Sequence, residues 1–200
     1  MKTEVLNHNQ ILRICNRFAF QIIENFLPSD DAYAIHECLT SPEVPWNFNW
    51  STASTNDDCG HGYFTHEVFK SNTDDPKTHM VYSTQGVALL GNLLLTRGVD
   101  YLRYIKFNMY PRTQEIVEHG KHFDVVGFRE DQPWSQKGEK TILYYVNDND
   151  GFTKYFPDGK DPIIVPSRFN TAVYTDENIM HNSSTCTDKP ARITININFR

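Results

Sequence analysis

The 200-residue sequence contains no apolar run of the roughly 18 residues that a membrane-spanning helix needs. Its longest candidate, residues 87–95, is interrupted by Gly91 and Asn92. The N-terminal MKTEVLNHNQ lacks the apolar core of a signal peptide. Basic clusters are also absent, since 19 Lys and Arg face 25 Asp and Glu, for a formal net charge of -6. Phosphate neutralisation needs clustered Lys and Arg. We therefore expect a cytoplasmic protein with neither a nucleic-acid nor a membrane partner.

Closely spaced cysteine pairs are missing as well. The four cysteines are far apart in the chain and form no C-x-x-C pair: Cys15, Cys38, Cys59 and Cys186. This spacing favours free thiols in a reducing compartment over a disulfide framework. Cys59 lies near His61 and His66, which are zinc-ligand types, but the recognised second half of a zinc site does not follow. We expect no zinc there.

The N-terminal half combines strand and helix signals. Apolar residues 18–26 predict a strand, and Ser29 with the two following aspartates predicts the cap of a helix that continues to about Thr40. A second helix is expected from Ser83 or Thr84 to Gly98, because four apolar side chains between them fall on one face. Two more strands are expected at residues 46–50 and 63–69.

From Asp100 onward the side-chain pattern repeats every two residues, as in a strand. Tyr104, Lys106, Asn108 and Tyr110 alternate with apolar neighbours and with Arg103. Further short strands are expected at residues 141–146, 152–156, 163–165, 171–174 and 192–199. Strands at this spacing, separated by turn residues, predict a sandwich, barrel or jelly roll. We expect one mainly β domain with flanking helices (α+β) over residues 1–200. Residues 1–99 would form a helix-supported part, and residues 100–200 the β-core.

One short motif in the C-terminal half carries metal-ligand types. Residues two apart in a strand point to the same face, so His122 and Asp124 would project together while Phe123 points away. One imidazole and one carboxylate are two thirds of a facial triad, which a third ligand from a distant strand would complete. Such a triad leaves metal positions open, as Fe(II) needs for a cosubstrate and O2. A surface ion pair is the alternative for this motif alone.

The last predicted strand has one apolar and one polar face. Ile193, Ile195, Ile197 and Phe199 share the first, and Arg192, Thr194, Asn196 and Asn198 share the second. An interior strand of this kind faces a polar cavity, whereas an edge strand would face water. In a cavity, the planar fork of Arg192 would match a carboxylate. The Tyr145 hydroxyl is a second candidate donor, although Tyr144 and Tyr145 also fit as core aromatics.

These residues come in a recognisable order. The order runs through Tyr110, His122-x-Asp124, the Thr-x-x-x-Tyr-Val-Asn sequence at 141–147, Gly151-Phe-Thr153-x-x-Phe156, His181 and Arg192. It resembles the Fe(II)- and 2-oxoglutarate-dependent oxygenases, specifically their prolyl 4-hydroxylase-like branch. The segments 118–124, 149–151 and 181–188 look more particularly like small oxygenases of tailed phages of marine bacteria. A phage-encoded protein would lie in the host cytoplasm.

The resemblance implies a double-stranded β-helix (jelly-roll, cupin-like) core. It implies His122, Asp124 and His181 as catalytic iron ligands, and Arg192 as the partner of the distal carboxylate of 2-oxoglutarate. Tyr145, Thr194 and Tyr110 would assist in binding the cosubstrate. Fe(II), 2-oxoglutarate and O2 would be required, and a need for ascorbate stays open. The activity would be hydroxylation of a prolyl or other peptidyl residue, or of a small molecule, with release of succinate and CO2.

Several alternatives stay open at this point. Lys189 rivals Arg192, but Pro190 follows it and disfavours a strand position. An AlkB-like nucleic-acid oxygenase is disfavoured by the acidic charge. The third reading is a jelly-roll binding or structural module without catalysis. The oligomeric state, the substrate and the role of residues 51–78 as a lid are not determined by the sequence.

Overall fold

The computed structural model describes residues 20–51, 61–71, 79–81, 90, 102–124, 140–175 and 179–199. One helix and eleven strands are bounded within them: β1 (Phe20–Glu24), α2 (Ser29–Thr40), β2 (Asn47–Asn49), β3 (Tyr63–Ser71), β4 (His79–Val81), β5 (Leu102–Pro111), β6 (Lys140–Tyr145), β7 (Phe152–Tyr155), β8 (Ile163–Pro166), β9 (Thr171–Thr175), β10 (His181–Ser183) and β11 (Ala191–Phe199). No helix among the described residues is both long and apolar enough to span a bilayer.

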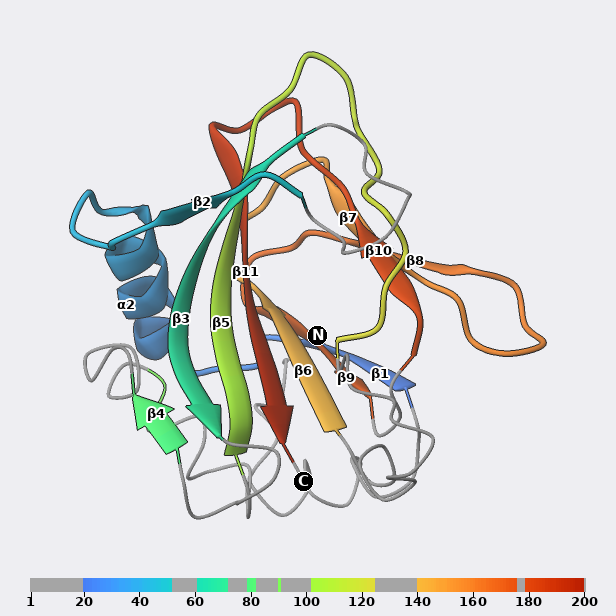
Figure 1. Cartoon of the computed structure of the whole chain (residues 1–200), viewed down its shortest axis with the longest axis horizontal. Coiled ribbons are helices and arrows are strands. Elements are labelled where there is room, and N and C mark those ends of the chain that lie inside the picture. Colours follow the sequence, from blue (N-terminus) through green and yellow to red (C-terminus); the bar gives the residue numbers. More distant parts are fainter. Residues whose placement is uncertain are drawn as a thin grey trace, which may run out of the picture.

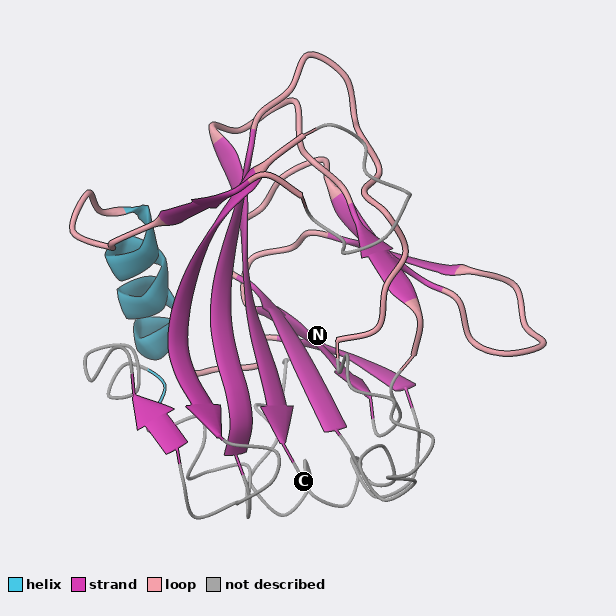
Figure 2. Ribbon diagram, viewed as in Figure 1, coloured by secondary structure: helices cyan, strands magenta, loops and turns pink. Residues whose placement is uncertain are grey.

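The strands form a large and a small antiparallel sheet. The large sheet has the order β1-β9-β6-β11-β5-β3-β2, with β4 paired to β3, and the small sheet has the order β10-β7-β8. In Figure 1 the long strands β3, β5, β11 and β6 lie side by side, and α2 stands against one side of them. Figure 2 shows how far strands outweigh helix in the described chain. The mainly β, jelly-roll fold class expected from the sequence is confirmed.

The main hydrophobic core lies between α2 and the large sheet. Ile193, Ile195 and Ile197 of β11 pack there with Ile35 and Leu39 of the helix. Each fully buried aliphatic side chain contributes about 1.5–3 kcal/mol. The apolar face predicted for β11 is therefore the core face. A smaller cluster holds Leu143, Tyr145, Tyr155, Val165 and Val173, from both sheets.

Most predicted elements are confirmed with small changes at their ends. The predicted cap of α2 is wrong in detail, because Pro28 holds the N-cap position and no side chain caps the helix. The Pro28 carbonyl instead accepts the amide of Ala32 at 3.0 Å. Asp30 and Asp31 lie in the first turn, where their charges favour the helix dipole. β4 and β10, of three residues each, were not predicted.

Some expectations fall outside the described residues. The second helix is represented only by Leu90, which is helical and buried. Residues 52–60 and 72–78, and hence most of the segment considered as a lid, are also outside. Cys38 and Cys186 are free thiols, as expected, whereas Cys15 and Cys59 lie outside the description. The division at residue 99 stays a prediction.

Asn170 anchors the chain between β1 and α2 to the turn before β9. Its side-chain amide donates to the Leu27 carbonyl and its Oδ1 accepts from the Leu27 amide, each at 2.9 Å. Its own backbone has a φ of 56°. Asparagine tolerates this left-handed conformation better than most residues.

We predict that Asn170→Ala lowers the free energy of unfolding by about 2–4 kcal/mol, measured by urea denaturation. Two buried backbone groups of Leu27 lose their partners, and alanine is strained at this φ by about 1–2 kcal/mol. Asn170→Gly is the matched variant, because it loses the same hydrogen bonds without the strain and should be destabilised less. A glycine variant as unstable as the alanine variant would contradict the strain contribution.

Candidate metal centre

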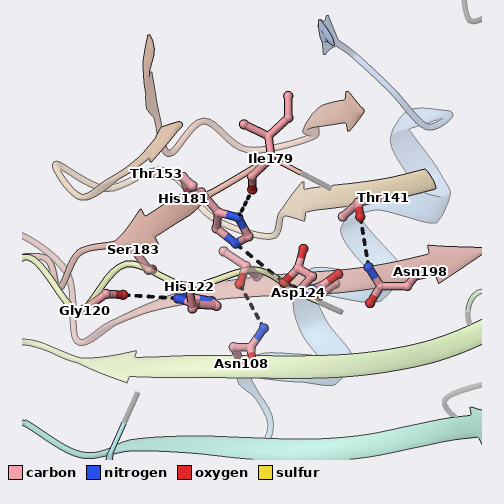
Figure 3. A network of polar contacts seen from close by, with 12 residues as sticks. Asn108, Gly120, His122, Asp124, Thr141, Thr153, Ile179, His181, Ser183 and Asn198 are labelled. Atoms are coloured by element: carbon pink, nitrogen blue, oxygen red, sulfur yellow. Dashed lines mark hydrogen bonds and ion pairs between the residues drawn. The ribbon is translucent and has the colours of Figure 1, made fainter. Parts of the chain in front are cut away.

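Three of the predicted site residues gather at one point. Candidate ligand atoms of His122, Asp124 and His181 all lie within 4.8 Å of one another. His181 Nε2 is 3.5 Å from Asp124 Oδ1, and the two imidazole centroids are 4.6 Å apart. Figure 3 shows the side chains pointing toward one another. Two imidazoles and a carboxylate form the donor set of a facial triad.

The strand predicted for His122 and Asp124 is wrong. His122 forms a single isolated bridge with His181, and Asp124 lies in a bend. The bridge consists of two backbone hydrogen bonds between His122 and His181, at 2.9 and 3.0 Å. The two imidazoles therefore meet because their own backbones pair. The chain does not have to continue as a strand to Asp124 for the two imidazoles to meet.

Backbone carbonyls orient both imidazoles. Nδ1 of His122 lies 3.1 Å from the Gly120 carbonyl, and Nδ1 of His181 lies 2.9 Å from the Ile179 carbonyl (Figure 3). A carbonyl can only accept, so Nδ1 carries the proton in each ring. Nε2 is then left as the electron-pair donor. Metal-binding histidines usually donate their other ring N–H to a carbonyl or carboxylate in this way. The donor set therefore fits a divalent metal.

The three groups influence one another's protonation. Burial alone would raise the pKa of Asp124, but the charge and hydrogen bond of His181 hold that pKa well below its usual range. Burial alone would lower the pKa of His181, but Asp124 and the Ile179 carbonyl raise it. Burial and the neighbouring His181 lower the pKa of His122. The cluster therefore holds one carboxylate and one imidazole that stays neutral.

Asn196 holds the carboxylate of the triad. Its Nδ2 donates to Asp124 Oδ1 at 2.6 Å. Asn196 lies on the polar face of β11 that the alternation predicted, two residues beyond Thr194. The Asn196 Oδ1 is buried and has no hydrogen-bond partner among the described residues. One end of the amide thus positions Asp124, while the other end is buried and unpartnered.

Arg192 is a fully buried cation held by hydroxyl groups. Its Nε donates to Ser167 Oγ at 2.7 Å, Nη1 to Ser183 Oγ at 2.6 Å and Nη2 to Thr153 Oγ1 at 2.7 Å. Among the described residues the guanidinium makes no ion pair. A guanidinium has five N–H donors, so two remain beyond these three bonds. A buried charge without a counter-charge is costly, and the remaining donors therefore fit a carboxylate ligand.

The triad and Arg192 share one cavity of about 320 Å³. It is lined by Ser51, Tyr63, Lys106, Asn108, Tyr110, His122, Phe123, Asp124, Leu143, Thr153, His181, Ser183, Arg192, Thr194 and Asn196. The roles of Thr194 and Tyr110 in binding a cosubstrate stay a prediction, but both residues line this cavity. Lys189 does not, since it is exposed and lines a separate hollow beside α2.

Tyr145 does not line the cavity. It is fully buried in the small core, and its ring centroid lies 5.6 Å from the Arg192 guanidinium carbon. Burial raises the pKa of Tyr145, although Arg192 and Thr153 act in the opposite direction. Its hydroxyl has no hydrogen bond of normal geometry among the described residues. Tyr145 therefore packs beside the guanidinium, and direct contact with a cavity ligand stays a prediction.

Aromatic side chains close another wall of the cavity. Tyr110 stacks between Tyr63 and His119, with centroid distances of 5.3 and 5.0 Å. Both nitrogens of His119 are buried without a hydrogen-bond partner among the described residues. Burial and then the Arg192 charge lower the pKa of His119 to about 3, so its imidazole is neutral. The sequence analysis missed Tyr63 and His119.

The alternation of β5 identifies further cavity residues. Lys106 and Asn108 line the cavity together with Tyr110, whereas Ile105 and Phe107 face the core. The polar side of β5 was visible in the sequence, but no role was assigned to Lys106 or Asn108.

A glycine allows the backbone to approach Arg192. A Cβ at Gly151 would lie 2.5 Å from the Thr185 carbonyl oxygen and 2.8 Å from Arg192 Cδ. Both distances are too short for a Cβ, and the Thr185 carbonyl belongs to the backbone, so it cannot move aside as a side chain could. Glycine at this position is therefore a requirement of close packing.

Comparison with known proteins shows the fold. No family model and no curated protein matches the sequence. Solved structures match it along nearly its whole length. An oxidoreductase of the 2OG-Fe(II) oxygenase family from Burkholderia pseudomallei has a TM-score of 0.66 at 11% identity, covering 100% of this chain and 93% of that one. A Pseudomonas putida prolyl-4-hydroxylase has a TM-score of 0.63 at 17% identity, covering 96% and 98%.

A third similar structure has a different activity. It is a non-heme alpha ketoglutarate dependent epimerase from nogalamycin biosynthesis, with a TM-score of 0.60 at 11% identity, covering 96% of this chain and 80% of that one. The chain thus has the fold of the 2-oxoglutarate- and Fe(II)-dependent oxygenases, and the resemblance found in the sequence is confirmed for the fold. A fold that also carries an epimerase does not define the reaction.

We predict that Asn196→Ala weakens the binding of Mn(II), used as a redox-stable probe, by about 10–100-fold, as loss of an outer-sphere partner usually does. Asn198→Ala is the matched control, because Asn198 lies on the same face of β11 but bonds to Thr141 at 2.9 Å. Its Mn(II) affinity should equal that of the wild type. Equal losses in both variants would contradict a specific role of Asn196.

We predict that Mn(II) affinity falls by about tenfold for each pH unit below the raised pKa of His181, because metal and proton compete for Nε2. In the metal-free protein, the raised pKa of His181 stabilises the fold below about pH 6.5, and this contribution is lost as the pH rises through the folded value. The lowered pKa of Asp124 stabilises the fold above about pH 4 and is lost at lower pH. Mn(II) titrations followed by electron paramagnetic resonance between pH 5 and 8 test the competition. A pH-independent affinity would contradict it.

Proposed function

We propose that this protein is an Fe(II)- and 2-oxoglutarate-dependent oxygenase. In this proposal His122, Asp124 and His181 hold Fe(II), and Arg192 binds the distal carboxylate of 2-oxoglutarate. The observation that carries the proposal is that one cavity contains both a metal-ligand triad and a buried guanidinium that has no counter-charge within the described part of the chain. A triad alone would be compatible with many metal sites, whereas the guanidinium adds a carboxylate subsite.

The chain's own residues bind and orient the reactants. Neutral Nε2 atoms of both histidines and the ionised Asp124 supply three ligands, with Asn196 fixing the carboxylate. The two remaining N–H groups of Arg192 donate hydrogen bonds to a carboxylate. Thr194 offers a hydroxyl on the same face of β11. The stacked rings of Tyr63 and Tyr110 supply an aromatic wall of the same cavity. With these groups in place, Fe(II) and 2-oxoglutarate would activate O2 so that a substrate C–H bond becomes C–OH, with release of succinate and CO2.

The substrate class in this proposal is a prolyl or other peptidyl residue. The similarity to a prolyl-4-hydroxylase supports that class, although at 17% identity it supports it only as an analogy. A second support is the surface beside the cavity. Phe48 and Trp50 are exposed on and beside β2, Trp50 by 84%, and Ser51 directly after them lines the cavity. Exposed aromatic side chains at a cavity entrance fit a bound peptide.

The test of the cofactor assignment is an anaerobic titration of apo-protein with Fe(II) and 2-oxoglutarate. We expect the weak visible charge-transfer band of the metal chelate, and we expect it to vanish in His122→Ala. A folded, metal-loaded wild-type protein without this band would overturn the proposed function.

The carboxylate subsite is tested in the same titration with Arg192→Ala. The loss of a buried charge partner corresponds to about 2–4 kcal/mol, or roughly 30–1,000-fold in 2-oxoglutarate affinity. Arg192→Lys retains the charge but not the fork, and should lie between the two. Lys189→Ala should bind 2-oxoglutarate as the wild type does. Because Arg192 is buried, thermal unfolding must show that the variants fold. An affinity unchanged in folded Arg192→Ala would contradict the assignment.

A further inference from the structure

Lys106 is a cation in the cavity that the proposed function does not use. It lies on the cavity face of β5, half-buried, and lines the same cavity as the triad. Its ammonium group is 6.0 Å from the centroid of the Tyr63 ring and 5.7 Å from that of Tyr104. Such contacts stabilise a cation only modestly. Among the described residues Lys106 makes no ion pair.

The acidic group across from Lys106 is already engaged. Glu67 lies opposite Lys106 in the register of β3 and β5. Its Oε1 accepts a hydrogen bond from the Tyr104 hydroxyl at 2.7 Å, and it makes no ion pair with Lys106. Glu67 does not line the cavity either. The ammonium group can thus bind an anion on the cavity side.

The strand register places Lys106 and Arg192 on different sides of the triad. Arg192 lies opposite Tyr110, and Lys106 lies opposite Asn196, four residues farther along both strands. Four residues correspond to about 13 Å of strand. Asn196 contacts Asp124, whereas the Arg192 partners Ser183 and Thr153 pair with each other in the small sheet, two residues along from His181. A carboxylate bound to Arg192 therefore enters on the His181 side, and Lys106 serves the Asp124 side.

The charges of the cavity lead to the same conclusion. Among the described residues, Lys106, Asp124 and Arg192 are the charged side chains that line it, since both histidines donate as neutral ligands. Fe(II), doubly anionic 2-oxoglutarate, Asp124 and Arg192 together have no net charge. Lys106 then leaves one positive charge, partly shielded from water. A singly charged anionic group on the substrate would balance it.

Resting on the proposed function, we propose that the substrate carries a carboxylate that binds Lys106. The carbon to be oxidised would then lie between Lys106 and the metal, with apolar parts of the substrate against Tyr63 and the 41%-exposed Phe123. The carboxylate can belong to a small free acid or to an acidic side chain of a peptide. Both sources offer the same group to the same ammonium, and the experiment distinguishes them.

The experiment compares acids with their uncharged amides on the anaerobic Fe(II) protein saturated with 2-oxoglutarate. The small-molecule pair is 3-phenylpropionate and 3-phenylpropionamide, and the peptide pair is N-acetyl-Pro-Glu-amide and N-acetyl-Pro-Gln-amide. Dissociation constants are measured by calorimetry and by perturbation of the chelate band. In the wild type, at least one acid should bind roughly tenfold more tightly than its amide, as expected for a charge-assisted hydrogen bond.

Substitution of Lys106 identifies the origin of that preference. In Lys106→Met the acid should bind no better than its amide, while the amide keeps its wild-type affinity. Lys106→Arg should retain the preference. Lys70→Met is the matched control, because Lys70 is an exposed lysine of β3 that does not line the cavity. It should behave as the wild type does.

The outcomes separate this inference from the proposed function. If the chelate band forms but neither acid binds better than its amide, the inference is wrong and the proposed function stands. The same holds if Lys106→Met keeps the preference for the acid. If Lys106→Met instead loses affinity for 2-oxoglutarate, then Lys106 serves the cosubstrate, which also overturns the inference. A missing band in the wild type contradicts the proposed function itself.

Discussion

The burial of the Arg192 guanidinium is the constraint on which the rest of this structure depends. Arg192 belongs to the large sheet, whereas Thr153 and Ser183 belong to the small sheet and Ser167 directly follows it. The three hydrogen bonds of one side chain therefore connect the two sheets across the cavity. A charge in this position costs solvation free energy, and hydroxyl groups recover only part of it. The connection between the sheets and the affinity for an anion thus have the same origin.

The cavity has an ordered distribution of charge. Fully buried Arg192 on β11 and half-buried Lys106 on β5 lie four register positions apart, and both line the cavity that contains the triad. Two cations separated along paired strands can each attract an anion without competing for the same one. The amide of Asn108 lines the cavity between the two cations, and the amide of Asn196 lies opposite Lys106 in the register. In the proposed function, this arrangement would orient a bound molecule before the reaction takes place.

The sequence revealed the parts of the site that local patterns encode. The alternation of β11 placed Arg192 and Thr194 on a polar face, and the triad residues could be named from their spacing and family order. The bridge between His122 and His181 could not be predicted, because it depends on a backbone pairing between residues far apart in the chain. The Asn196–Asp124 contact has the same dependence. For Tyr145 the strand face leaves both interpretations open, since its buried side chain belongs to the small core and also lies beside the Arg192 guanidinium.

Gly151 adds a consequence for how such sequences can diverge. A Cβ at this position would meet the Thr185 backbone carbonyl and the Asn149 side chain as well as the Arg192 methylene. A shorter residue at position 192 would relieve only one of these three contacts, so a side chain at position 151 also requires the backbone around Thr185 to move. Loss of this glycine in a related chain would therefore mark a rebuilt turn beside the guanidinium, and not a single tolerated substitution.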